Sequence, residues 1–142
     1  MRGITAGSGF ATAEMRLIMI RAVDAATKMF PRVNPTLFVD DLAADMTGPT
    51  NHVVDQLGGF IEEVAGYIKD TDQELSSTKS LCTSSHKEVG ELLCKRWAAK
   101  GINIEYKERV KALGAGLGAG VRRNMTVLRE RYYRYRRRIP KF

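Results

Sequence analysis

The sequence lacks any long hydrophobic run. Its longest uninterrupted apolar run, residues 17–20, has four residues, whereas a membrane-spanning helix needs roughly 18. The N-terminal residues also lack the basic, apolar and small-residue order of a secretory signal. We therefore expect an intracellular protein of the nucleus or cytoplasm, with no membrane partner.

Cysteine and histidine are scarce. The 142 residues include Cys82, Cys94, His52 and His86 and no others of either type. No C-x-x-C pair occurs, and the histidines do not stand at metal-ligand intervals from the cysteines. These spacings argue against a zinc site and predict two unpaired thiols in a reducing compartment.

Positive charge is scarce in the first two thirds of the chain and concentrated in the last third. Residues 1–94 hold 8 Lys/Arg against 13 Asp/Glu, whereas residues 95–142 hold 15 against 3. Such asymmetry is typical of a chain with one end that binds a polyanion, and nucleic acid is the usual partner. A solvated basic tail is the alternative.

The length and hydrophobic pattern predict one globular α+β domain. Apolar residues three or four positions apart predict helices over residues 12–30, 51–68 and 85–100. Gly58 and Gly59 are expected to interrupt the second of these helices. Short apolar or alternating runs predict strands at residues 36–39, 42–46, 79–83, 102–106 and 110–113. The order favours helices packed on one face of a small antiparallel sheet, followed by a basic C-terminal helix. We expect the last two strands to pair as a hairpin.

The first two predicted strands flank an acidic pair, Asp40-Asp41. This arrangement predicts a β-hairpin with both carboxylates at its tip. Aspartate is common in turns for structural reasons alone. Paired carboxylates held by two strands can also bind Mg²⁺, which prefers oxygen ligands, and such sites serve phosphoryl transfer.

The segment Phe38-Val39-Asp40-Asp41 resembles the F/Y-x-D-D box of reverse transcriptases, especially those of non-LTR retroelements. Three further segments resemble that family in the same order: the loop at residues 2–11, Ser77-Thr78-Lys79-Ser80, and residues 109–114. In the loop, Ala6-Gly7-Ser8 stands where the family usually has a Gln-Gly-x-x-x-S pattern, so the glutamine is replaced.

The resemblance implies a role for each matched segment. Asp40 and Asp41 would bind the catalytic Mg²⁺, and Lys79 would protonate the pyrophosphate leaving group. Three residues of the N-terminal loop would border the incoming nucleotide: Gly7, Ser8 and Phe10. Three residues of the last segment would belong to the hairpin that grips the primer end: Lys111, Leu113 and Gly114.

The C-terminal segment interleaves arginines with tyrosines. Arginine binds phosphate through two parallel hydrogen bonds, and tyrosine can stack on an unpaired base. A contact with the RNA template and DNA primer would suit this segment, through Arg122, Arg123, Arg131, Arg134 and Arg138. A nuclear-localisation-like tail is the alternative.

The resemblance divides the chain into a partial palm, residues 1–114, and a Gly-rich turn with a basic helix, residues 115–142, which would begin the thumb. The family's palm carries a further catalytic aspartate on a strand before the N-terminal loop, and fingers that hold the nucleotide. We therefore expect an N-terminally truncated fragment with Met1 as an internal start. A missing N-terminal segment or a partner chain would complete the palm. The parent activity would be Mg²⁺-dependent nucleotide addition to a primer 3′ end on an RNA template, and the lone chain would be inactive.

Two other functions fit parts of the sequence. A non-enzymatic, basic nucleic-acid-binding module would account for the C-terminal charge alone. A dinucleotide-binding domain would account for residues 114–119, which match G-x-G-x-x-A. Too few residues follow for a βαβ unit, and arginines stand where the ribose-binding acid belongs, so we expect a turn there.

Overall fold

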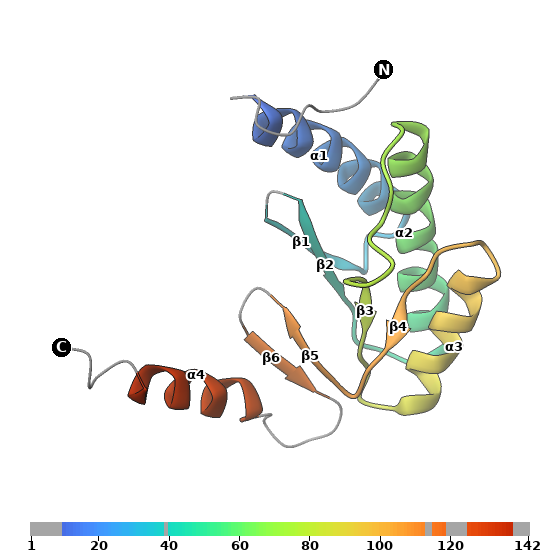
Figure 1. Cartoon of the computed structure of the whole chain (residues 1–142). Coiled ribbons are helices and arrows are strands. Elements are labelled where there is room, and N and C mark those ends of the chain that lie inside the picture. Colours follow the sequence, from blue (N-terminus) through green and yellow to red (C-terminus); the bar gives the residue numbers. More distant parts are fainter. Residues whose placement is uncertain (1–9, 39, 113–114, 119–124, 138–142) are drawn as a thin grey trace.

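The chain combines helices with antiparallel and parallel pairs of strands (Figure 1). The computed structural model describes residues 10–38, 40–112, 115–118 and 125–137. The elements run in the order α1 (Ala11–Met29), β1 (Asn34–Phe38), β2 (Asp41–Asp45), α2 (Thr50–Asp70), β3 (Leu81–Cys82), α3 (Lys87–Ala98), β4 (Glu105–Tyr106), β5 (Arg109–Ala112), β6 (Ala115–Gly118) and α4 (Thr126–Arg136). The expected α+β class is confirmed. None of the helices in these ranges is long and apolar enough to cross a membrane.

The first core cluster lies between α1, α2 and the hairpin β1–β2. Its buried members on the helices recur at three- and four-residue spacing, as the sequence predicts: Met19, Ala22, Val23 and Ala26 on α1, and Phe60, Val64 and Ile68 on α2. Leu37 and Leu42 of the hairpin pack against this cluster. The cluster therefore anchors the hairpin to the helices.

A second core cluster joins α3 to α2 and β3. Val89, Leu93 and Trp97 are buried with Cys82. The indole of Trp97 is 2% exposed, and its Nε1 donates a hydrogen bond to the carbonyl oxygen of Gly58 at 3.1 Å. The one polar atom of this side chain is therefore satisfied inside the core.

The expected interruption of α2 by Gly58 and Gly59 is wrong. The helix runs without a break from Thr50 to Asp70, and both glycines are buried. A Cβ atom at Gly59 would overlap the ring of Phe30, and one at Gly58 would meet the side chain of Arg96. The missing side chains let the neighbouring elements approach α2 closely, and this packing outweighs the low helix propensity of glycine.

The described strands form three separate two-stranded sheets. This arrangement corrects the expected single antiparallel sheet with helices on one face. β1 pairs with β2 and β5 with β6, both antiparallel, whereas β3 pairs with β4 in parallel through the crossover helix α3. Parallel strands need such a crossover, and local sequence patterns do not predict which strands it will pair.

The expected hairpin between residues 102–106 and 110–113 is wrong, as is the expected turn in the glycine run. β4 pairs with β3 (Cys82↔Tyr106), and β5 pairs with β6 (Arg109↔Gly118). A strand that follows within two residues closes a hairpin at little entropic cost. Because Ala115–Gly118 pairs antiparallel with β5, it does not form the loop between a strand and a helix that a dinucleotide fingerprint requires.

Candidate catalytic hairpin and nucleic-acid interface

The acidic pair lies at the tip of the hairpin β1–β2, as the sequence predicts. The strands pair in register from Asn34↔Asp45 to Phe38↔Asp41, and Asp40 lies in the turn between them. Because side chains alternate along a strand, Leu37 faces the first core cluster while Phe38, 63% exposed, shares the opposite face with Asp41. Both carboxylates are exposed.

The exposed carboxylates of Asp40 and Asp41 fit a magnesium site that is completed by water and substrate. Among the described residues, neither Asp40 nor Asp41 takes part in an ion pair, and no group of three or more metal-ligating side chains gathers anywhere. Mg²⁺ is commonly held by one or two carboxylates together with water and substrate phosphates. The donor set therefore fits a substrate-assisted site and not an all-protein cage.

Lys79 lies in an exposed turn between α2 and β3, and its expected place on a strand is wrong. β3 begins at Leu81, and both β3 and its partner β4 are two residues long. No ion pair joins Lys79 to either aspartate within the described part of the chain.

The other residues expected around the nucleotide and primer fall in three places. Phe10 is exposed and caps the start of α1, where its carbonyl oxygen accepts a hydrogen bond from the backbone N–H of Glu14 at 2.9 Å. Lys111 lies on β5 opposite Gly116. Four further candidates lie outside the described residues: Gly7, Ser8, Leu113 and Gly114.

The basic helix α4 lies apart from α1, α2 and α3, on the side of the hairpin β5–β6 (Figure 1). Arg131 and Arg134 are exposed on it, whereas Arg122, Arg123 and Arg138 lie outside the described residues. The guanidinium carbon of Arg136 stands 5.9 Å from the centre of the Tyr132 ring, within range of a cation–π contact. Exposed arginine and tyrosine on one helix supply both phosphate donors and stacking surfaces.

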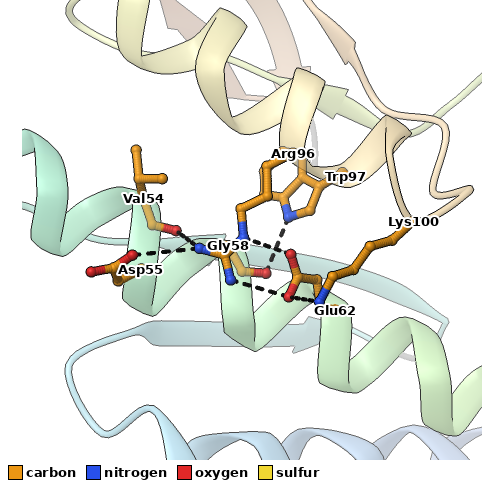
Figure 2. Close-up of polar contacts among 7 residues, drawn as sticks. All are labelled: Val54, Asp55, Gly58, Glu62, Arg96, Trp97 and Lys100. Carbon is orange, nitrogen blue, oxygen red and sulfur yellow. Dashed lines mark hydrogen bonds and ion pairs between the residues drawn. The ribbon is translucent and has the colours of Figure 1, made fainter.

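Sequence reasoning assigns no role to Glu62 or Arg96, which join α2 to α3 (Figure 2). Arg96 donates from Nε to Oε1 of Glu62 at 2.6 Å and from Nη2 to Oε2 at 3.1 Å. It also donates from Nη1 to the carbonyl oxygen of Val54 at 2.9 Å. Lys100 donates to Oε2 of Glu62 at 2.7 Å. The hydrogen bond from Arg96 holds the pKa of the Glu62 carboxyl below its ordinary value.

Both thiols are free, as the sequence predicts. Burial raises the pKa of Cys82 to about 12, and the neighbouring Cys94 thiol adds to this rise. Burial also raises the pKa of Cys94. The thiolate is the reactive form of cysteine, so both side chains act as small apolar groups in the second core cluster.

No protein-family model matches this chain, and neither the curated proteins nor the solved structures contain a significant match. A functional assignment therefore depends on the chain's own residues and their geometry.

Proposed function

We propose that the chain is part of a reverse transcriptase, an enzyme that adds nucleotides to a primer 3′ end on an RNA template with Mg²⁺. One observation carries this proposal: a core-anchored antiparallel hairpin holds Asp40 and Asp41 at an exposed turn. The hairpin β5–β6 adds support, since it begins within the segment that resembles the family's primer grip.

The proposal assigns a role to each of these residues. Asp40 and Asp41 would hold Mg²⁺, which stabilises negative charge on the attacking and leaving oxygens of a phosphoryl transfer. Lys79, exposed in its turn, would approach the pyrophosphate and donate a proton to it. Lys111 on β5 would contact the primer, and Arg131 and Arg134 on α4 would contact phosphates.

The matched residues include two of the family's catalytic aspartates and not the third. We therefore expect this chain to bind metal and primer–template without efficient nucleotide addition. A partner or further segment that carries the third aspartate would complete the site.

Manganese titration tests the metal site directly. Mn²⁺ replaces Mg²⁺ and broadens nearby amide signals in ¹⁵N spectra of the full chain bound to an RNA template annealed to a DNA primer. We expect broadening centred on the hairpin tip, and its loss in an Asp40→Asn/Asp41→Asn variant. The matched control is Asp70→Asn/Asp72→Asn. These two aspartates are exposed at the end of α2, so their replacement removes the same charge at a different place. Equal broadening in the two variants would refute the site, as would any primer extension that survives Asp40→Asn/Asp41→Asn.

A non-enzymatic nucleic-acid-binding module is the second candidate, and the exposed arginines of α4 favour it. Contacts with about six phosphates predict a slope of roughly −5 for log affinity against log salt on duplex. Arg131→Gln/Arg134→Gln should reduce the magnitude of this slope by roughly 2, and a Lys28→Gln/Lys69→Gln control should leave it unchanged. Nucleic-acid affinity that changes neither with added metal nor in Asp40→Asn/Asp41→Asn would favour this candidate. An unchanged slope in Arg131→Gln/Arg134→Gln would exclude it.

A further inference from the structure

Four exposed apolar side chains follow one side of the basic C-terminal helix. Met125 precedes α4 directly, and Leu128, Tyr132 and Tyr135 follow on the helix. Their exposed fractions are 43%, 43%, 56% and 66%. The spacing of three, four and three residues keeps them on one face. We call these four residues the α4 stripe.

Neither core cluster contains a residue of the α4 stripe, and Figure 1 shows α4 apart from the other three helices. The sequence continues the same spacing at Val121 and Ile139, which lie outside the described residues. Contiguous apolar surface on a helix that belongs to neither core cluster of the described residues is typical of an interaction site. The repeat is that of the a and d positions in a coiled coil.

Arginines border the α4 stripe on both sides. With Met125 at an a position, Arg129 and Arg136 fall at e positions and Arg131 at a g position, and all three are exposed. Charges at e and g select the partner in a coiled coil. A second copy of α4 would place arginine against arginine, and like charges at an interface act against pairing. The occupant must therefore carry acidic residues beside its apolar stripe.

We propose that the α4 stripe is a docking surface for an acidic amphipathic helix of another protein. Apolar a and d residues of the partner cover Met125, Leu128, Tyr132 and Tyr135, and its flanking carboxylates pair with the bordering arginines. The heptad spacing favours a helix over nucleic acid, which requires no apolar repeat, and over an anionic membrane, which takes up a broader apolar face than a and d positions alone supply. Arg137 falls on the opposite side of the helix, and Arg134 lies away from the stripe. Arg131 borders the stripe and is also one of the two arginines proposed above to contact phosphates, so the two ligands would share this residue. The inference goes beyond the proposed function, because it rests on the apolar spacing of the α4 stripe.

A designed peptide tests this surface without any nucleic acid. The probe is a 21-residue helix with leucine at a and d and glutamate at e and g, whose own charge keeps it monomeric. A second peptide carries lysine at e and g instead. We expect one-to-one binding of the glutamate peptide to the full chain in calorimetry, and at least about tenfold weaker binding of the lysine peptide. Equal binding of the two peptides, or binding of neither, would overturn the proposal.

Variants of α4 locate the contact. Leu128→Ser/Tyr132→Ser should weaken binding of the glutamate peptide by about tenfold or more, because it removes two central apolar anchors. The matched control is Tyr133→Ser, since this tyrosine is 63% exposed on the same helix but lies off the stripe. Its affinity should stay within about twofold of the original. Equal losses in the two variants would contradict the assignment.

Charge reversal gives a gain of function that loss of folding cannot imitate. Arg129→Glu/Arg136→Glu should shift the preference from the glutamate peptide towards the lysine peptide, and an unchanged preference would overturn the proposal. The same assays with a single-stranded oligonucleotide and with phosphatidylserine vesicles separate the other classes of partner. If either one binds in a manner that depends on Leu128 and Tyr132 while the glutamate peptide does not, the stripe serves that ligand instead.

Discussion

Replacement of Glu62 by glutamine should destabilise the chain by about 2 kcal/mol. The carboxylate is 12% exposed and accepts two hydrogen bonds from Arg96, whose side chain is 30% exposed. A hydrogen bond to a charged group contributes about 1.5–3 kcal/mol, and partial exposure places this pair in the lower part of that range. The Lys100 contact adds little, because that side chain is 58% exposed. Glutamine keeps one acceptor oxygen, but its NH₂ group replaces the other oxygen and places a hydrogen-bond donor beside the cations.

Thermal and urea unfolding of the full chain measure this loss. Trp97, the only tryptophan, is buried in the second core cluster, so its fluorescence reports separation of α3 from α2. A loss of 2 kcal/mol should lower Tm by about 6 °C in a chain of this size. The matched control is Glu63→Gln, which forms no ion pair within the described residues and should stay within about 0.5 kcal/mol of the original chain.

A double-mutant cycle with Arg96→Gln isolates the pair from other effects of each substitution. We expect a coupling energy of about 2 kcal/mol. A value below about 0.5 kcal/mol, the level of an exposed pair, would refute the reasoning that the Glu62–Arg96 contact stabilises the junction of α2 and α3.

The remaining predictions concern the pH dependence of this contact, the close approach at α2 and the buried thiol. Because the pKa of Glu62 is lowered in the folded chain, its stabilising effect is present above the ordinary glutamate pKa and is lost as pH falls through the folded value. The difference in unfolding free energy between the original chain and Glu62→Gln should therefore shrink in acid, and a constant difference would contradict this. Gly59→Ala should cost about 1–2 kcal/mol in urea unfolding because the new methyl overlaps the Phe30 ring. Gly66→Ala on the same helix meets nothing within 4 Å and should stabilise by up to about 1 kcal/mol; the same sign for both would refute the packing argument. Cys82, whose pKa burial raises to about 12, should react with iodoacetamide at pH 8 at least about tenfold more slowly in the folded chain than in urea, and equal rates would contradict its burial.

Local patterns predict the elements that depend on local contacts. The three- and four-residue spacing of apolar side chains locates α1 and α2 to within two residues at each end, because a helix buries one face of its own sequence. The hairpin β1–β2 is predictable for a related reason. Its strands stand on either side of a short acidic turn, so pairing needs no distant partner.

Patterns of the same kind fail where a partner lies far along the chain. Residues 102–106 alternate as a strand should, yet only Glu105–Tyr106 pair, and they pair with Leu81–Cys82 across the whole of α3. Alternation identifies a strand and its faces without identifying its partner. The glycine run is the reverse case: Ala115–Gly118 has little strand propensity and becomes a strand because β5 lies two residues away.

The candidate site also has features that local sequence predicts and features that depend on the tertiary structure. The sequence by itself locates Asp40 and Asp41 at a hairpin tip and concentrates arginine and tyrosine on one C-terminal helix, since both features depend on the order and spacing of neighbouring residues. Only the tertiary structure reveals that Lys79 lies in a turn and that Glu62 and Arg96 meet across 34 residues of chain. It also reveals that the apolar stripe of α4 is exposed and outside both cores. Helix and turn formation is local, whereas ion pairing and burial depend on which surfaces the folded chain brings together.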